Sequence, residues 1–323
     1  MTMEEASTHN RNEGAPLDLA LVRNARANRS AIERRADTIA KRRSIKKEWQ
    51  VAWLVKAVSC IDLTTLAGDD TRGNVLRLCS KAKKPVRQDI LDGFGLADEK
   101  IQVGAVCVYH NLISYAVEGL EGTTIPIAAV STGFPAGQTP FALKIKEINE
   151  SVRAGAHEID IVVSRSYVLR GEWRELYREV QAYREACGKA HLKTIIATGE
   201  LGTLRNVARA SLVCMMAGAD FIKTSTGKEP VNATLPVSLV MMRAIREYED
   251  LTGQVVGFKP AGGIRKAKES LAWLALVKEE LDDRWLSPEL FRFGASSLLA
   301  DIERQLEHNL TGRYSSFYRH PVS

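Results

Sequence analysis

The sequence predicts an α/β protein with one domain, a closed (β/α)₈ TIM barrel that carries an N-terminal helical extension and a short C-terminal tail. From residue 52 onward, short apolar runs rich in β-branched residues alternate with amphipathic stretches of helical spacing. This alternation implies parallel strands, and eight such runs occur before residue 296. An open doubly wound sheet typically has fewer strands, and no Gly-x-Gly-x-x-Gly follows the first run, so the barrel is favoured.

Residues 1–50 are polar and rich in arginine, with helical character from Leu19 to Lys47, and we interpret them as an extension. Within them, residues 41–47 read Lys-Arg-Arg-Ser-Ile-Lys-Lys, which is compatible with a nuclear-localisation or nucleic-acid patch. Short basic runs are more often a solvated helix face, so a nucleic-acid partner is not favoured. The predicted barrel then covers residues 51–300 and the tail residues 301–323.

The eight predicted strands are all short and apolar: Ala57–Leu63, Val103–Tyr109, Ile125–Ser131, Glu158–Ser164, Leu192–Thr198, Phe221–Ser225, Val255–Lys259 and Phe291–Ala295. Apolar residues at three- and four-residue steps predict helices between them, at Phe141–Ala154, Glu172–Ala190, Thr203–Ala217, Pro236–Thr252 and Lys266–Leu281. Four glycines separate a helical stretch from the next strand, as C-cap glycines do: Gly155, Gly188, Gly218 and Gly253.

The composition excludes several classes of protein. The 323 residues are 45% hydrophobic with a formal net charge of +6, which is unlike a collagenous, disordered or disulfide-stapled chain. The five cysteines are odd in number and widely spaced, as reduced core residues are. No apolar run reaches the roughly 18–20 residues of a membrane span, and the first residues are unlike a signal peptide. We expect a cytoplasmic protein, with nuclear access open and no membrane partner.

Two lysines stand at the ends of neighbouring predicted strands, where barrels carry their catalytic groups. Alternation along the sixth strand places Lys223 on the side opposite to Ile222, so Lys223 points into the barrel if Ile222 packs outward. The same alternation turns Lys259 inward on the seventh strand. A second ammonium and apolar burial both lower the pKa of a lysine from its ordinary value of about 10.4. The pair therefore suits Schiff-base chemistry, in which a neutral amine attacks a carbonyl.

Acidic groups stand on two further strands. Asp160 interrupts the apolar fourth strand and faces the interior by the same alternation. It is interpreted either as a buried counter-ion or as the group that moves protons beside a Schiff-base lysine. Asp62 and Thr64 end the first strand, where catalysis and turn formation are equally open interpretations. The histidines form no zinc pattern, so we expect a metal-free mechanism.

Glycine and serine gather in the loops after the last strands. Gly262 and Gly263 follow the seventh strand, and Gly294-Ala295-Ser296-Ser297 span the end of the eighth and the loop after it. Gly227-Lys228 come soon after Lys223. In barrels these loops commonly bind a phosphate through backbone N–H groups and a short helix N-terminus. We therefore expect a small phosphorylated substrate.

These residues lie in motifs that resemble the deoxyribose-phosphate aldolase family. In chain order the matching pieces are Asp62-Leu63-Thr64-Thr65-Leu66, Val106-Cys107-Val108-Tyr109, Phe134-Pro135-x-Gly137, Glu158-Ile159-Asp160-Ile161-Val162, Thr198-Gly199-Glu200-Leu201, residues 217–228, residues 257–265 and Arg292-Phe293-Gly294-Ala295-Ser296-Ser297. The extension and tail resemble the animal branch of the family. Departures from the bacterial pattern are Ala197 in place of a glutamate and Ser164-Arg165 in place of Phe-Pro.

The resemblance implies a lysine-dependent barrel enzyme without metal or cofactor that reversibly cleaves 2-deoxy-D-ribose 5-phosphate to acetaldehyde and D-glyceraldehyde 3-phosphate. It implies that Lys223 forms the Schiff base, Lys259 is the second active-site lysine and Asp160 relays protons. The expected supporting residues are Asp62, Thr64, Cys107 and Thr198. The expected phosphate-binding residues are Gly227, Lys228, Gly262, Gly263, Gly294, Ser296 and Ser297. Tyr314 and Tyr318 in the tail are left out of the catalytic set.

Two other functions stay open at this stage. One is a non-covalent sugar-phosphate isomerase or epimerase on the same barrel, which would leave the lysine pair unexplained. The other is binding of nucleic acid or another partner by the basic segment of residues 1–50, which is compatible with catalysis elsewhere. The resemblance also leaves the assembly open, since the family includes monomers, dimers and tetramers.

Overall fold

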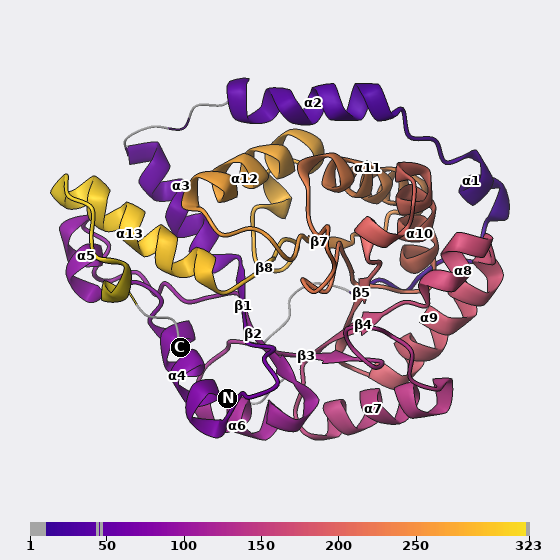
Figure 1. The fold of residues 1–323 in the computed structure, drawn as a ribbon, viewed down its shortest axis with the longest axis horizontal. Coiled ribbons are helices and arrows are strands. Elements are labelled where there is room, and N and C mark those ends of the chain that lie inside the picture. The colour runs from indigo at the N-terminus through magenta and orange to yellow at the C-terminus, as the bar shows by residue number, and fades with distance from the viewer. Residues whose placement is uncertain (1–10, 43–44, 46–47, 321–323) are drawn as a thin grey trace.

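Eight parallel strands form a single sheet in the order β7-β6-β5-β4-β3-β2-β1-β8 (Figure 1). The computed structural model describes residues 11–42, 45 and 48–320. The strands are β1 Ile61–Thr64, β2 Ala105–Tyr109, β3 Ile127–Ser131, β4 Glu158–Val162, β5 His191–Ile195, β6 Phe221–Lys223, β7 Gly257–Lys259 and β8 Phe293–Ala295. Parallel bridges Phe258–Phe291 and Ala261–Gly294 join β7 to the β8 segment. The predicted barrel is therefore confirmed.

Helices surround this sheet. Before β1 lie α1 Leu19–Asn24, α2 Arg29–Arg42 and α3 Glu48–Ser59. The helices that follow are α4 Arg72–Lys83, α5 Gln88–Gly93, α6 Ile113–Gly119, α7 Phe141–Arg153, α8 Arg165–Arg170, α9 Trp173–Cys187, α10 Leu204–Met216, α11 Leu235–Thr252, α12 Ala267–Leu281 and α13 Ser297–Thr311. Short 3₁₀ turns add η2 His110–Leu112, η3 Thr198–Glu200, η4 Asp283–Trp285 and η5 Phe317–Arg319.

The predicted elements are found, with two corrections. The first strand begins at Ile61 instead of Ala57. Leu54, Ala57 and Val58 have helical spacing, and they lie on the buried face of α3. The single helix predicted from Leu19 is two helices, since α1 ends at Asn24 and the Asn28 side chain accepts a hydrogen bond from the backbone N–H of Ala31 at the start of α2. The end of that predicted helix, Lys46 and Lys47, lies outside the described residues.

Alternation along the strands produces two separate apolar regions. Outward side chains such as Ile159, Ile222 and Phe258 pack with the helices in one large core. Inward side chains form a small second cluster inside the barrel: Cys107, Ala128, Val130, Phe134, Val162 and Ile195, with Leu66 and Tyr109 packed against it. Polar groups that share the interior with this second cluster are therefore held in an apolar surrounding.

The N-terminal segment is fixed to the barrel by buried polar contacts. The Asn12 side chain is 3% exposed and donates to the carbonyl oxygens of Met215 and Ala219, each at 2.8 Å. Its oxygen accepts from the Tyr248 hydroxyl at 3.0 Å, and its backbone N–H donates to Asp220. Further along, α2 lies along α11 and α12 (Figure 1). The segment thus spans the outside of one side of the barrel.

Two elements cross the boundaries that the sequence suggested between the parts of the chain. Helix α3 runs through residue 50, and α13 runs through residue 300. The division into an extension of residues 1–50, a barrel of 51–300 and a tail of 301–323 stays a prediction. Among the described residues, no helix has the length and apolar character that crossing a bilayer requires.

Candidate active site

Three lysines and three carboxylates meet inside the barrel. Asp160 on β4 lies at the centre: its Oδ2 accepts from Lys223 Nζ and from Lys259 Nζ, each at 2.7 Å. Its Oδ1 accepts from Lys193 Nζ at 3.0 Å. Lys259 also donates to Asp62 on β1. Asp62, Asp160 and the three lysines are at most 3% exposed as residues, so solvent screens their charges little.

A second layer of charge continues from Lys193. Its ammonium donates to Glu158, and Glu158 in turn accepts from Arg292, with 3.1 Å between Arg292 Nη2 and Oε1. Glu158 and Arg292 are 3% and 5% exposed. The carboxylate of Asp160 is therefore held from one side by Lys193 and from the other by the Lys223–Lys259 pair.

The strands bring these groups together through their register. Lys223 pairs with Lys259 across β6 and β7, and Asp160 pairs with Lys193 across β4 and β5. Small residues leave the space that the long side chains need. A Cβ on Gly294 would lie 3.2 Å from Cε of Lys259 and 2.7 Å from the Cβ of Ala261. The Gly294 position therefore accommodates the stem of Lys259.

The lysines differ in how their surroundings act on them. Burial, reinforced by the Lys259 ammonium, lowers the pKa of Lys223 although Asp160 opposes the shift. Burial alone would also lower the pKa of Lys259, but Asp160 and Asp62 outweigh it and the net pKa is raised. The pKa of Lys193 is raised as well, because Asp160 and Glu158 outweigh its burial. Lys223 is thus the lysine of this cluster that loses its proton most readily.

Two acids of the cluster, Asp160 and Glu158, stay ionised. Burial alone would raise the pKa of Asp160, but the three lysines overcome it and hold the pKa well below its usual range. Arg292 and Lys193 likewise overcome burial and lower the pKa of Glu158 to about 2. Four basic side chains therefore face three carboxylates in this interior. Charge balance favours one neutral base, and the pKa shifts identify it as Lys223.

The inner apolar cluster adjoins these charges. Cys107 belongs to it and is fully buried, and burial raises the pKa of its thiol to about 12. A protonated thiol at this place contributes an apolar wall rather than a nucleophile. The chemistry that this interior supports is therefore that of a neutral amine beside a fixed carboxylate.

Three glycine-containing loops approach one another after β6, β7 and β8. Gly227 and Gly262 have φ values of 86° and 81°, and a Cβ on Gly262 would lie 2.8 Å from the Cα of Gly227. Gly262 follows Ala261, which bridges to Gly294. The exposed Ser296 and Ser297 then begin α13. These loops offer backbone groups and a helix N-terminus to an anion.

Four other residues of the expected site lie at the end of a strand, in a 3₁₀ turn or in loops. Gly263 and Lys228 are exposed on the same loops. The Thr64 hydroxyl donates to the carbonyl oxygen of Asp62 at 2.8 Å, which is a local turn contact. Thr198 begins η3, and its buried hydroxyl has no hydrogen-bond partner among the described residues. In the part of the chain that the structure describes, no group of three or more His, Cys, Asp and Glu side chains is placed to hold a metal ion.

Three charged residues of the cluster were missing from the sequence-based set: Lys193, Glu158 and Arg292. The alternation that turns Asp160 inward also turns Glu158 inward, two residues earlier on the same strand. It turns Lys193 inward between Leu192 and Thr194 on β5. The strand pattern therefore contains a signal for Glu158 and Lys193, which is the same alternation that turns Asp160 inward.

Comparison with known proteins agrees with this geometry. The chain is 58% identical over 319 residues to the human deoxyribose-phosphate aldolase, covering 98% of this chain and 100% of the relative. It is 60% identical to the mouse deoxyribose-phosphate aldolase, covering 96% and 98% of the two chains. A crystal structure of a putative deoxyribose-phosphate aldolase from Toxoplasma gondii has the same fold, with a TM-score of 0.68, 20% identity and coverage of 84% and 99%.

A crystal structure of a putative deoxyribose-phosphate aldolase from Coccidioides immitis matches with a TM-score of 0.63 and 23% identity, covering 87% of this chain and 99% of that chain. At these sequence identities, the similarity to the two crystal structures shows the fold alone. The family model for DeoC/LacD family aldolases matches residues 56–302, a segment that contains every charged residue of the barrel interior. The chain therefore belongs to the DeoC/LacD family of aldolases.

Proposed function

We propose that the protein is a deoxyribose-phosphate aldolase that cleaves 2-deoxy-D-ribose 5-phosphate to acetaldehyde and D-glyceraldehyde 3-phosphate through a Schiff base on Lys223. The observation that carries this mechanism is the excess of one basic group in the barrel interior, together with the lowered pKa of Lys223. A neutral amine is the form of lysine that attacks a carbonyl.

In the cleavage direction, the Lys223 amine adds to C1 of the open-chain sugar, and loss of water gives a protonated imine. The imine draws the electrons of the C2–C3 bond as that bond breaks. Asp160 takes the proton of the C3 hydroxyl through a water, so C3 leaves as the aldehyde of D-glyceraldehyde 3-phosphate. Protonation of the enamine at C2 and hydrolysis then release acetaldehyde and restore the amine.

Lys259 has two roles in this proposal. Its ammonium disfavours a second positive charge on Lys223 and so keeps the nucleophile neutral. It also lies 2.7 Å from the same Asp160 oxygen that Lys223 contacts, so it can join the proton relay at that oxygen. Asp62 and Lys193 hold Lys259 and Asp160 in these positions.

The phosphate of the substrate binds in this proposal at the loops of Gly227, Gly262 and Gly294 and at the start of α13. Lys228, Gly263, Ser296 and Ser297 complete this set. Binding energy from the phosphate, remote from the reacting carbons, orients C1 toward Lys223. The neighbouring Cys107 and Thr198 form part of the walls.

The decisive experiment is incubation with 2-deoxyribose 5-phosphate or acetaldehyde in the presence of borohydride, followed by peptide mass mapping. We expect a reduced ethyl adduct on Lys223 from acetaldehyde. A folded protein with no adduct at excess substrate would favour a non-covalent sugar-phosphate isomerase or epimerase. An adduct on Lys259 or Lys193 instead would reassign the nucleophile.

The proposal includes a cytoplasmic location, with access to the nucleus, and leaves assembly into a homo-oligomer open. Support for the first comes from the five cysteines, all of which are free and buried. Fractionation of cells tests the compartment, and light scattering of the purified chain tests the assembly.

A further inference from the structure

A buried ion pair lies deeper in the barrel than the lysine cluster. Glu158 stands two residues before Asp160 on β4, and Arg292 stands two residues before Gly294 of β8. Because alternate residues of a barrel strand share one face, both side chains enter the interior near the N-terminal ends of the strands. Arg292 Nη2 lies 3.1 Å from Glu158 Oε1, and the two residues are 5% and 3% exposed.

A row of alternating charges connects this pair to the proposed nucleophile. Glu158 accepts from Lys193, whose Nζ also lies 3.0 Å from Asp160 Oδ1. The other oxygen of Asp160 lies 2.7 Å from Lys223 Nζ. The row therefore runs from Arg292 through one acid, one lysine and a second acid to Lys223. Its five residues are at most 5% exposed, so solvent screens each charge little from the next.

Stability is a weak explanation for the Glu158–Arg292 pair. Apolar residues of similar volume often replace a buried ion pair without loss of stability, because desolvation of the two charges offsets their attraction. The chain nevertheless keeps space for the guanidinium. A Cβ on Gly104 would lie 3.1 Å from Cδ and 3.2 Å from Nε of Arg292. The retained charge therefore calls for a role in the chemistry of the interior.

Four further titratable groups face the row: Cys60 and Glu289 near Arg292, His191 near Glu158, and Cys107 near Lys223. Burial raises the pKa values of both thiols to about 12, so they are uncharged at neutral pH. Burial also lowers the pKa of His191, which leaves its ring neutral there. Glu289 is exposed and screened by solvent. The Lys259–Asp62 pair completes the charges of the interior.

We propose that Arg292 and Glu158 are positioning residues of the aldolase, whose opposite charges act through Lys193 and Asp160 to set the protonation of the Lys223 amine. The inference rests on the proposed Schiff-base role of Lys223. The guanidinium adds a positive charge that disfavours a second ammonium in the interior, whereas the Glu158 carboxylate favours it. Without Arg292, three lysines would face three carboxylates, and the surplus that leaves one amine neutral would disappear.

The test is the pH profile of kcat/KM for 2-deoxyribose 5-phosphate, whose acid limb reports deprotonation of Lys223 in the free enzyme. Arg292→Gln should move this limb to higher pH by about half a unit, which lowers the rate on the limb about threefold. Glu158→Gln should move it to lower pH. The double variant should return it close to the wild-type position. Lys144→Met is the matched control, since it removes a buried cation outside the row and should leave the limb in place.

Opposite shifts that cancel in the double variant would not follow from a merely structural role, because lost packing lowers the rate in every variant. Shifts of the same sign, or identical profiles, would overturn the inference. If Arg292→Gln fails to fold, comparison of Glu158→Gln with the double variant isolates the charge of the guanidinium, and the limb should lie at higher pH in the double variant.

A second measurement needs no turnover. Labelling of Lys223 by acetaldehyde and cyanoborohydride, followed by peptide mass mapping, reports its neutral amine, and its pH dependence should shift as the acid limb does. These shifts without any cleavage of 2-deoxyribose 5-phosphate would reject the aldolase and retain the charge coupling. Cleavage and an adduct on Lys223 with unshifted profiles would reject the coupling alone.

Discussion

Lys144 and Lys223 are both buried lysines that contact carboxylates, yet their surroundings differ. Lys144 lies between α7 and α9, 4% exposed, with its Nζ 3.5 Å from Glu179 and 3.3 Å from the Ser164 hydroxyl. Glu179 also accepts from the Tyr183 hydroxyl at 2.9 Å. Here one ammonium faces one carboxylate, and the Ser164 hydroxyl accepts from Lys144 and donates to Glu179.

The cluster around Lys223 has one more basic group than acidic groups, and that surplus of one basic group is what makes the cluster reactive. A balanced buried pair joins neighbouring helices, whereas an unbalanced cluster favours the neutral form of one amine. Burial of a lysine is therefore a poor indicator of reactivity by itself. The number of charges that share the space decides between structure and catalysis.

The largest effect is expected from Lys223→Leu, which removes the surplus basic group. We expect kcat/KM for 2-deoxyribose 5-phosphate to fall by a factor of about 10³ or more, because the nucleophile is lost. The melting temperature is expected to stay unchanged or rise, since three basic groups then face three carboxylates. Steady-state kinetics and thermal unfolding measure the two effects. Turnover at the wild-type rate would contradict the assignment.

Lys259→Met tests whether the second ammonium keeps Lys223 neutral. Without it the pKa of Lys223 rises, so a smaller fraction is free amine at neutral pH. We expect kcat to fall by about 10²–10³ and its pH profile to move to higher pH, because a proton donor is lost as well. Lys259→Arg keeps the charge and serves as the control for the profile. An unshifted profile in the methionine variant would argue against this role.

Lys144→Met examines the balanced pair. Removal of the cation leaves Glu179 buried without its counter-charge, and we expect the free energy of unfolding to fall by about 3 kcal/mol. Urea denaturation measures this loss, while kcat should change by less than about threefold since no reacting group is touched. Adding Glu179→Gln should restore part of the stability. A large loss of kcat with unchanged stability would reverse the interpretation of the two clusters.

The smallest expected effect is a slope in stability with pH. Because the pKa of Lys223 is lowered in the folded protein, the unfolded chain binds more protons between that pKa and about 10.4, the ordinary lysine value. The unfolding free energy should therefore rise with pH across this window, by up to about 1.4 kcal/mol per unit. Lys223→Leu should remove this contribution. Parallel curves for the two proteins would show that Lys223 is an ordinary lysine.

The sequence was sufficient for the barrel and for the position of three inward side chains. Periodicity located every strand, and alternation placed Lys223, Lys259 and Asp160 on one side of their strands. The resemblance to a known family supplied their roles. These features depend on local chain geometry, which a single sequence records directly.

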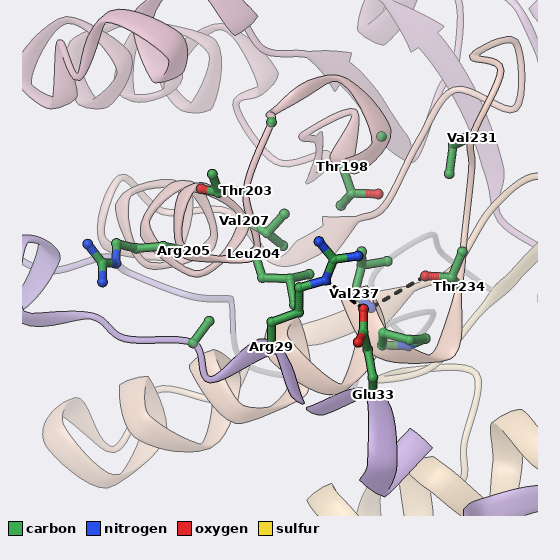
Figure 2. A pocket seen from close by; sticks show the side chains of 14 residues that line it. Arg29, Glu33, Thr198, Thr203, Leu204, Arg205, Val207, Val231, Thr234 and Val237 are labelled. Carbon is green, nitrogen blue, oxygen red and sulfur yellow. Dashed lines mark hydrogen bonds and ion pairs between the residues drawn. The ribbon is translucent and has the colours of Figure 1, made fainter. Parts of the chain in front are cut away.

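The parts that escaped the sequence depend on distant residues. The ends of the first strand and of α3 depend on which residues pair with β2 and β8. The charge surplus required Arg292, whose partner Glu158 is 134 residues away in sequence. A pocket lined by Arg29 and Thr203 exists because α2 lies beside a loop some 170 residues later in the chain (Figure 2). The spacing of residues in the sequence does not reveal such a contact.

The anchoring of Asn12 has a consequence for synthesis. Its partner Tyr248 lies 236 residues later in the chain. At roughly 5–20 residues per second, a ribosome needs about 10–50 s to make the intervening chain. During that interval the side of the barrel that receives the N-terminal segment is incomplete. The segment therefore leaves the ribosome early, but it binds the barrel only after most of the barrel has been synthesised.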